Sequence, residues 1–361
     1  MKILYAIQGT GNGHISRAID IVPILQREHD VDVLISGTQA DLSLPFPVKY
    51  KYQGLSFIFG KKGGVDVLKT YKNSHISILF SEINSLPVQQ YDLVINDFEP
   101  VSAWACYQKN KPCISLSHQA AVLNKKAPQP KQNDLFGRAI LKTYAPVSTK
   151  YGFHFMEYDQ NIFTPVIRKQ IREQHTSNNG HYTVYLPAYD DKRLIKVLSG
   201  CRDTKWEIFS KHNKKMIEEK NITIRPVSND AFIRSMATSE GILCGAGFET
   251  PAEALFMKKK LMVIPMKGQF EQQCNAAALK QMGVPVIKSL RKKHLSKIKD
   301  WIEAKQHIEV DYPDNTEAIL KSILKEHGLA DGMNAIQPGK KVYSLKKFKQ
   351  MTLRKIAAQI L

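Results

Sequence analysis

The chain opens with Lys2-Ile-Leu-Tyr-Ala-Ile7 and continues with Gln8-Gly-Thr-Gly-Asn-Gly13-His14, and this stretch decides the fold. The apolar run is typical of a buried strand, and residues 15–26 carry apolar side chains at helical spacing. A strand that enters a helix through a glycine-rich turn is the first unit of an α/β domain with a parallel sheet. Glycine in such a turn lets a ligand approach the backbone closely. The stretch therefore predicts a ligand loop formed by Gly11, Asn12 and Gly13.

The glycine spacing of this loop argues against two common nucleotide sites. The spacing is G-x-G-x-G, whereas the dinucleotide fingerprint is G-x-G-x-x-G and needs an acidic residue after the second strand. The second predicted strand, 31–35, ends in Ser36-Gly37 instead. A P-loop requires a terminal G-K-[ST], which the loop lacks. An NAD-dependent enzyme is thus disfavoured and a P-loop is excluded.

Apolar runs of strand length recur along the chain and alternate with helical segments, which predicts parallel strands joined by crossover helices. Residues 164–168 and the polar run 173–180 break this pattern and indicate a linker. We expect an α/β protein with two Rossmann-like doubly wound domains that face each other across a cleft. The expected parts are a first domain at 1–168, a second domain at 181–335 and a basic C-terminal helix at 336–361. Strands are expected at 2–7, 31–35, 92–95, 112–116, 182–186, 206–210, 222–225, 241–244 and 261–264.

Composition supports two globular domains. A chain of 361 residues is longer than one ordinary domain, and its apolar share of 43% is sufficient to form two hydrophobic cores. The five cysteines are scattered without a C-x-x-C pair, which predicts reduced thiols in a cytoplasmic protein. No run has the length of a signal-peptide core or a membrane span.

The formal net charge of +19 would attract an anionic partner, and a solvated cationic surface without such a partner explains it equally well. Nucleotide phosphates, nucleic acid and acidic lipid headgroups would all be attracted. Nucleic acid is not expected, because neither interleaved aromatic residues nor a known binding module is evident. The tail after Pro338 places basic residues beside an apolar helical face, so it can lie on an anionic membrane or dock on the protein itself. Both alternatives remain open.

Two residues suggest a general base. His14 stands at the mouth of the glycine loop, and histidine side chains ionise near neutral pH. Asp97 follows the predicted strand 92–96, and residues just past parallel strands gather at one edge of the sheet. Asp97 is therefore expected to hold the His14 ring in a base dyad, with Glu99 as a less favoured substitute.

His118 and Gln119 follow the strand that ends at Leu116, on the same predicted edge. We expect them in the acceptor or phosphate region, together with the glycine loop. A polar loop without a ligand explains them equally well.

The second half contains a candidate phosphate site. Cys244 ends a predicted strand, and Pro251 is expected to open a helix. The turn between them consists of Gly245, Ala246, Gly247, Phe248, Glu249 and Thr250. A helix N-terminus behind small residues offers free N–H groups and a positive dipole end, which suits a diphosphate. Thr250 and Glu253 also match the capping box T-x-x-E, so a structural role for Glu253 stays open.

A second polar run, Glu271-Gln272-Gln-Cys-Asn275-Ala276, follows the next strand. Together with the turn after Cys244, it resembles the nucleotide-sugar glycosyltransferases of the GT-B fold. These include the UDP-glucosyl- and glucuronosyltransferases and the bacterial N-acetylglucosaminyltransferase of peptidoglycan lipid synthesis. The turn departs from many relatives, which carry His or Arg with Ser there, and the spacing from Pro265 to Glu271 is longer than in the plant enzymes.

The resemblance implies that the domain at 1–168 is acceptor-binding and that the domain at 181–335 is nucleotide-sugar-binding. It also implies a role for each motif. The turn at 245–250 would bind the diphosphate, Glu253 the ribose hydroxyls, and Glu271 with Gln272 the donor sugar. His14 would be the base and Asp97 its orienting acid. We expect an inverting glycosyltransferase that uses a nucleoside-diphosphate sugar, UDP-linked by preference, without a metal site or cofactor. The D-x-D signature is not evident near the site, and Asp190-Asp191 is expected to cap a helix.

Two other functions remain open. A nucleotide-sugar 2-epimerase of similar fold would need additional acids and histidines that no pattern identifies. A non-catalytic protein could bind anions or a membrane through its charge alone. The acceptor follows no general code, although the basic charge and the lipid-enzyme resemblance favour a lipid-linked hydroxyl.

Overall fold

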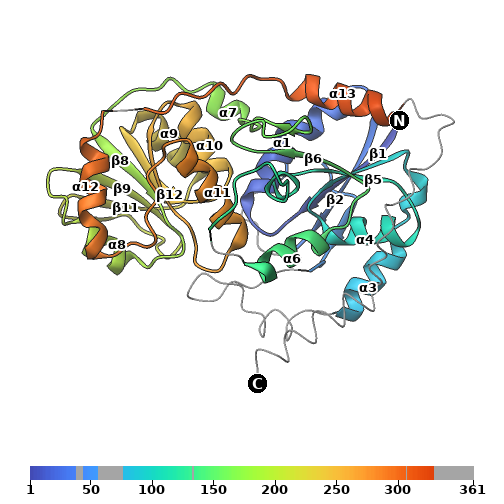
Figure 1. Cartoon of the computed structure of the whole chain (residues 1–361), viewed down its shortest axis with the longest axis horizontal. Coiled ribbons are helices and arrows are strands. Elements are labelled where there is room, and N and C mark those ends of the chain that lie inside the picture. Colours follow the sequence, from blue (N-terminus) through green and yellow to red (C-terminus); the bar gives the residue numbers. More distant parts are fainter. Residues whose placement is uncertain (38–43, 56–75, 132–133, 306, 329–361) are drawn as a thin grey trace.

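A computed structural model describes residues 1–37, 44–55, 76–131, 134–305 and 307–328. It consists of two α/β halves, each built on its own sheet, which is the GT-B arrangement expected from the sequence (Figure 1). The expected basic helix at 336–361 lies outside the described residues.

The first sheet has seven parallel strands in the order β3-β2-β1-β4-β5-β6-β7. The central strands are buried along their whole length, which is why they are continuous apolar runs in the sequence. The order reverses between β1 and β4, and such a switch point leaves a crevice at the carboxyl ends of the strands. The strands are β1 Lys2–Gln8, β2 Asp30–Ser36, β3 Tyr50–Tyr52, β4 Leu93–Asp97, β5 Cys113–Leu116, β6 Thr149–Phe153 and β7 Ile162–Phe163.

Helices cover both faces of this sheet. They are α1 Asn12–Leu25, α3 Ile76–Ser85, α4 Pro100–Gln108, α5 His118–Val122 and α6 Leu135–Tyr144, with a 3₁₀ turn at Val88–Gln90. A short helix, α7 Lys169–Arg172, lies in the linker that leads to the second half.

The second sheet has six strands in the order β10-β11-β9-β8-β12-β13, parallel except for β10. Its order reverses between β8 and β12, which places a second crevice at the end of β12. The elements are β8 His181–Tyr185, α8 Asp191–Leu198, β9 Lys205–Ser210, β10 Ile217–Glu219, β11 Ile222–Pro226, α9 Asn229–Thr238, β12 Gly241–Gly245, α10 Glu249–Phe256, β13 Lys260–Ile264, α11 Phe270–Gln281, a 3₁₀ turn at Lys292–His294, and α12 Leu295–Glu303.

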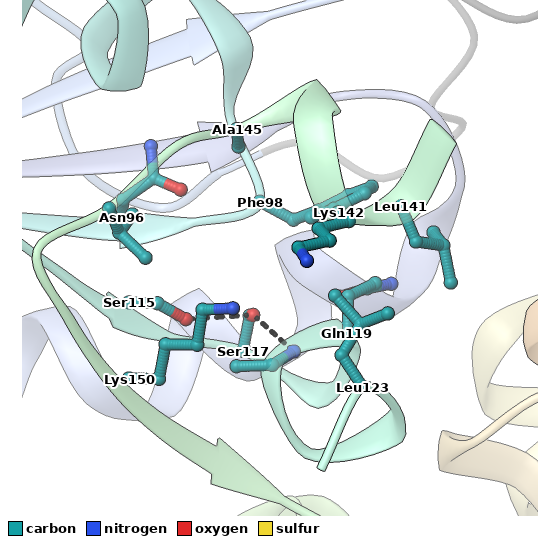
Figure 2. A pocket seen from close by; sticks show the side chains of 12 residues that line it. Asn96, Phe98, Ser115, Ser117, Gln119, Leu123, Leu141, Lys142, Ala145 and Lys150 are labelled. Carbon is teal, nitrogen blue, oxygen red and sulfur yellow. Dashed lines mark hydrogen bonds between the residues drawn. The ribbon is translucent and has the colours of Figure 1, made fainter. Parts of the chain in front are cut away.

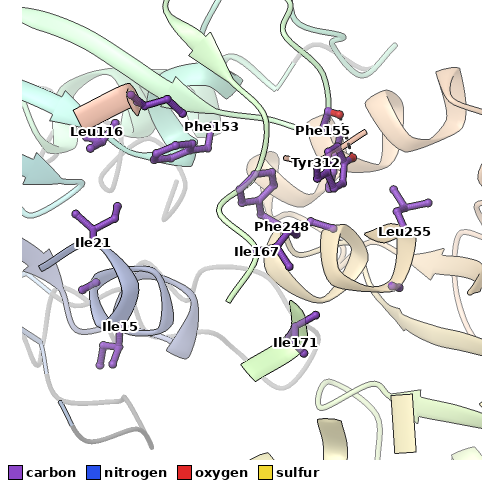
Figure 3. Packing of buried hydrophobic residues seen from close by; sticks show 14 of the residues in the cluster. Ile15, Ile21, Leu116, Phe153, Phe155, Ile167, Ile171, Phe248, Leu255 and Tyr312 are labelled. Carbon is purple, nitrogen blue, oxygen red and sulfur yellow. Dashed lines mark hydrogen bonds between the residues drawn. The ribbon is translucent and has the colours of Figure 1, made fainter. Parts of the chain in front are cut away.

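One apolar cluster continues from the first half into the second. It includes Ile15 of α1, Phe155 after β6, Ile167 of the linker and Phe248 before α10. Figure 3 shows Phe248 and Ile167 between Ile21 on the α1 side and Leu255 of α10, and the rings of Phe155 and Phe248 lie 5.2 Å apart. The two walls of the cleft are therefore held together by shared core packing.

The last described helix, α13 Thr316–Gly328, returns to the first half (Figure 1). It contacts α1, and Glu317 Oε2 accepts a hydrogen bond from Arg27 Nη1 at 2.8 Å. Ile319 and Leu320 of this helix join the cluster that contains α1. The domain limits predicted from the sequence remain a prediction.

The predicted strands are confirmed to within two residues at each end. Asp190 caps α8 as expected, since Asp190 Oδ1 accepts from the backbone N–H of Arg193 at 2.8 Å. Two helix starts were wrong. The first helix, α1, begins at Asn12 and not at residue 15, so Asn12 and Gly13 of the predicted loop belong to its first turn. Helix α10 begins at Glu249 and not at Pro251, because the N–H of Ala252 already donates to the carbonyl of Phe248.

All five cysteines are buried free thiols. Among the described helices, none combines the length and the apolar character needed to cross a membrane.

Candidate active site

His14 and Asp97 meet as expected. His14 lies in the first turn of α1, Asp97 ends β4, and the pairing of β1 with β4 brings Ile7 beside Asp97. His14 Nδ1 lies 2.8 Å from Asp97 Oδ1, and the exposed fractions of the two residues are 9% and 0%. An imidazole that donates from Nδ1 to a carboxylate keeps a lone pair on Nε2. The pair therefore has the geometry of an oriented base.

Arg17 completes this group and was missed by the sequence analysis. Its Nη2 lies 2.7 Å from Oδ1 and 2.8 Å from Oδ2 of Asp97, and its Nε lies 3.1 Å from Oδ2. Burial alone would raise the pKa of Asp97, but the charges of Arg17 and His14 outweigh it and hold this pKa below its ordinary value. The only sequence signal was the i, i+3 spacing from His14, which puts both side chains on one face of α1.

Arg17 also reaches the second half of the chain. Its Nη1 lies 2.8 Å from Oε1 of Glu249, the first residue of α10. Gly13 faces the same carboxylate so closely that an added Cβ would lie 2.4 Å from Glu249 Oε2. A side chain at position 13 would therefore displace the Glu249 carboxylate from its present position beside Arg17.

The turn before α10 keeps free backbone donors. No side chain caps α10 in the described part of the chain, and the N–H groups of Glu249 and Thr250 fall in the first turn, where helical acceptors are absent. An added Cβ at Gly247 or at Gly11 would meet no atom within 4 Å, so both glycines border open space. Ala246 is fully buried and fixes the base of the turn.

Glu253 does not form the capping box with Thr250 that its sequence pattern allows. Its carboxylate instead accepts two hydrogen bonds from Arg168, Nε to Oε1 at 2.5 Å and Nη2 to Oε2 at 2.9 Å. Arg168 also donates from Nη1 to Asn229 Oδ1 at 2.9 Å. Burial raises the pKa of Glu253 although Arg168 opposes this shift. The sequence analysis assigned Arg168 to the linker and missed this contact, because the pairing joins residues far apart in the chain.

His118 connects the two halves directly. Its Nδ1 lies 2.8 Å from the carbonyl oxygen of Phe153, and its Nε2 lies 2.8 Å from Oδ1 of Asn275. Its ring stacks on Phe248 with centroids 3.9 Å apart. Asn275 in turn donates to the carbonyl oxygen of Ala246 at 3.1 Å, which connects His118 to the turn at 245–250. Burial lowers the pKa of His118 and favours its neutral form.

Gln119 lies between the base and the predicted sugar residues. Its Nε2 donates to Glu271 Oε2 at 3.0 Å and lies 3.4 Å from His14 Nε2. Its Oε1 is buried and has no hydrogen-bond partner among the described residues. Gln272, next to Glu271, uses its Oε1 to accept from the N–H of Met266 at 2.9 Å. The structure thus brings the first-half and second-half candidates to one place.

Glu99 is not available to orient His14. Its carboxylate accepts from the N–H groups of Val101 and Ser102 and from the hydroxyl of Ser36, at 2.6–2.7 Å. It caps α4, where a side-chain acceptor satisfies free helix donors.

A shallow pocket lies in the first half beside this site, and the roughly 300 Å³ of space that it outlines includes open solvent (Figure 2). Its walls come from the ends of β4 and β5 and from α5, α6 and β6. Phe98 and Gln119 border both the pocket and the base, since the rings of His14 and Phe98 are stacked with centroids 6.4 Å apart. The pocket therefore lies directly beside His14.

Comparison with known proteins identifies a family and related folds. A family model described as glycosyl transferase family 1 matches residues 1–304. The structure of S. aureus MnaA with UDP is 12% identical, covers 92% of this chain and 99% of that chain, and has a TM-score of 0.62. Acinetobacter baumannii MurG is 15% identical, with coverages of 90% and 99% and a TM-score of 0.53.

A plant protein shows the same likeness. Phytolacca americana UGT2, complexed with UDP-2fluoro-glucose and pterostilbene, is 13% identical over 99% of this chain and 98% of that chain, with a TM-score of 0.55. Identities at this level establish the shared fold alone. No curated protein sequence matches the chain.

Proposed function

Because this chain belongs to glycosyl transferase family 1, we propose that it is an inverting glycosyltransferase that uses a UDP-linked sugar and a hydroxyl acceptor. The observation that carries the proposal is the His14–Asp97 pair, buried at the switch point of one sheet and facing the phosphate turn of the other. The UDP or UDP-sugar named in two of the related structures supports uridine as the nucleoside of the donor.

The donor is proposed to bind the second half. Its diphosphate would accept from the free N–H groups of Glu249 and Thr250 at the positive end of α10. The open space at Gly247 would admit the phosphate oxygens. Glu271 and Gln272, at the start of α11, would bind the sugar hydroxyls, and Gln119 holds the Glu271 carboxylate in place from the other half.

Glu253 is proposed to bind the ribose together with Arg168. A carboxylate has about four lone-pair sites, so two remain after the two bonds from Arg168. The ion pair opposes the protonation that burial favours, and it orients the carboxylate towards the hydroxyl protons that its ionised form would accept.

The reaction would proceed by direct displacement. His14 Nε2 takes the proton from the acceptor hydroxyl, and the oxygen attacks the anomeric carbon on the face opposite the leaving group. The bond to the diphosphate breaks, and the departing UDP carries the electron pair to the N-terminus of α10. Asp97 stabilises the imidazolium that forms on His14, and Arg17 holds Asp97 ionised. The chain uses its own donors at each step, so we propose a reaction without a metal ion.

The acceptor is proposed to occupy the first half, at the glycine loop and the pocket beside Gln119. The net charge of +19 would favour an acceptor at an anionic membrane surface, including a lipid-linked one.

A nucleotide panel tests the proposal. UDP, GDP and TDP are compared by thermal shift, and the expected result is a selective rise in melting temperature with UDP. Incubation with UDP-sugars alone is then followed by NMR. Slow release of free sugar and UDP supports a transferase, whereas an epimerised sugar would identify the 2-epimerase alternative. A chain that binds none of the three nucleotides would contradict the proposal.

A further inference from the structure

The pocket beside Gln119 combines an apolar wall with two cationic side chains. Phe98, Leu123 and Leu141 form part of the wall, and Lys142 of α6 and Lys150 of β6 line the same space. Figure 2 shows the side chains of both lysines directed towards the space that Ser117 also lines. Such a lining suits a ligand with an apolar portion and a negative charge.

Nothing in the described structure neutralises these two lysines. No hydrogen bond or ion pair joins Lys142 or Lys150 to another described residue, and none of the residues that line the pocket is acidic. Both residues are exposed, so a ligand can reach them. Partial loss of water around the Lys150 ammonium lowers the pKa of Lys150, and the neighbouring charge of Lys142 lowers it further. The two ammonium groups thus repel each other, and the described lining of the pocket supplies no negative charge to offset them.

The floor of the pocket supplies a hydroxyl group. Ser117 Oγ lies 3.2 Å from Ser115 Oγ and accepts from the N–H of Ala120 at 3.2 Å. Its proton can therefore be donated to a ligand in the pocket. Asn96 cannot contribute, because its amide already donates to the Glu99 carbonyl and the Ser102 hydroxyl.

The position of the pocket relates it to the proposed base. Gln119 lines the pocket and has its Nε2 3.4 Å from His14 Nε2. Phe98 lines it as well and stacks with the ring of His14. A molecule held by the two lysines would therefore extend towards His14.

We propose that Lys142, Lys150 and Ser117 bind a phosphate group of the acceptor, so that the acceptor is a hydroxyl compound carrying a phosphate. This inference rests on the proposed function for its assignment to the acceptor. Two ammonium groups supply the charge that balances a phosphate, and lysine binds phosphate as a compact point charge. The phosphate can belong to a lipid headgroup or to a soluble sugar phosphate.

Binding of phenyl phosphate, measured by calorimetry with UDP at saturation, tests the proposal without knowledge of the natural acceptor. UDP fills the proposed donor site, so that the probe reports on the pocket alone. Benzyl alcohol serves as the uncharged probe. We expect phenyl phosphate to bind and benzyl alcohol not to bind at the same concentration. The variant Lys142→Gln/Lys150→Gln should bind phenyl phosphate at least about tenfold more weakly, with unchanged affinity for UDP.

A matched variant controls for the general loss of charge. Lys292→Gln/Lys293→Gln removes the same charge from the exposed 3₁₀ turn before α12, and it should bind phenyl phosphate as the wild type does. Equal weakening in both double variants, or undiminished binding in the pocket variant, would overturn the inference.

Vesicles separate the two sources of phosphate. Phosphatidylcholine vesicles with and without phosphatidic acid are tested against the same variants. If vesicle binding is lost only in the pocket variant, a lipid headgroup enters the pocket. If vesicle binding falls equally in both variants while phenyl phosphate binding falls only in the pocket variant, the ligand is a soluble phosphate.

The two hypotheses fail in different ways. A wild type that binds UDP but not phenyl phosphate overturns the phosphate inference and leaves the glycosyltransferase proposal intact. A wild type without UDP binding and without UDP-sugar hydrolysis overturns the proposed function itself.

Discussion

The guanidinium of Arg17 lies 2.8 Å from the carboxylate of Glu249, and this ion pair joins the first helix of one half to the phosphate-facing helix of the other. The same guanidinium binds both oxygens of Asp97. One side chain therefore positions Asp97 and also contacts the second half, in addition to the apolar cluster that the two halves share.

Replacement of His14 tests the base. We expect His14→Ala to lower kcat by about 10²–10⁴-fold, the usual contribution of one general base, with little change in the affinity for UDP. Steady-state kinetics and calorimetry provide both values. His175→Ala, at an exposed histidine of the linker, is the control and should behave as the wild type. Full activity of His14→Ala would remove His14 from the mechanism.

Replacement of Arg17 should lower the unfolding free energy more than replacement of its partner Glu249 does. Arg17→Gln leaves Asp97 buried without its main partner, and breaking a buried pair in this way costs about 3–5 kcal/mol. Glu249→Gln should cost about 1 kcal/mol or less, because Glu249 is 27% exposed and its charge is screened by water. Urea unfolding of both variants measures the difference. Equal losses would show that Arg17 contributes through Glu249 and not through Asp97.

The lowered pKa of Asp97 predicts that the stability of the folded protein falls at acidic pH. The folded-state pKa of Asp97 lies below the unfolded value of about 3.9, so the unfolded chain binds the proton more readily. The stabilisation by ionised Asp97 is therefore present above that value and is lost as the pH falls through the lower folded-state pKa. We expect the difference in unfolding free energy between wild type and Asp97→Asn to shrink between pH 5 and pH 2. A constant difference across this range would contradict the assignment.

The Arg168–Glu253 pair is suited to a double-mutant cycle. Single variants Arg168→Met and Glu253→Met each leave one buried charge unpaired, whereas the double variant leaves none. We expect the double variant to lose less unfolding free energy than the two single variants lose in sum. The difference, which is the coupling energy, should be about 1–3 kcal/mol. UDP binding is measured in each variant that remains folded. Weakened UDP binding in the double variant, despite its recovered stability, supports the ribose role of Glu253, and unchanged binding opposes it.

Alanine variants of two glycines test whether each glycine is needed for stability or for ligand binding. At Gly247 an added methyl group meets no atom of the protein, so Gly247→Ala should leave the melting temperature unchanged. If the diphosphate lies there, UDP binding should weaken by at least about tenfold because the methyl group excludes it. At Gly13 the methyl group would collide with Glu249, so Gly13→Ala should lower the melting temperature. A normal UDP affinity in Gly247→Ala would place the phosphates elsewhere.

Much of the site could be predicted because parallel sheets follow strict rules. Once the run Lys2–Ile7 and the run before Asp97 are identified as strands, both must end on one edge, and His14 must follow the first of them. The contact between His14 and Asp97 is a consequence of that topology. The contacts of Arg17 and Arg168 were not predictable in this way, because a long flexible side chain can reach partners on several elements.

Local patterns also allowed more than one outcome. The motif Thr250-x-x-Glu253 satisfies the capping rule, and the same carboxylate can instead form an ion pair. Glu99 lies two residues from Asp97, yet the peptide N–H groups of α4 and the hydroxyl of Ser36 occupy its carboxylate. Only the packing around each carboxylate decides which donors are close enough to bind it.

The sequence by itself determined the two α/β halves, the glycine loop with its base and the turn before α10, because apolar periodicity and glycine placement act over short distances along the chain. The tertiary structure decided which residues face one another across the halves: Arg17 with Glu249, Gln119 with Glu271, and His118 with Asn275 and Phe248. These pairs lie more than a hundred residues apart. Their distances depend on how the two sheets pack over the shared core, and no short-range pattern in the sequence encodes that packing.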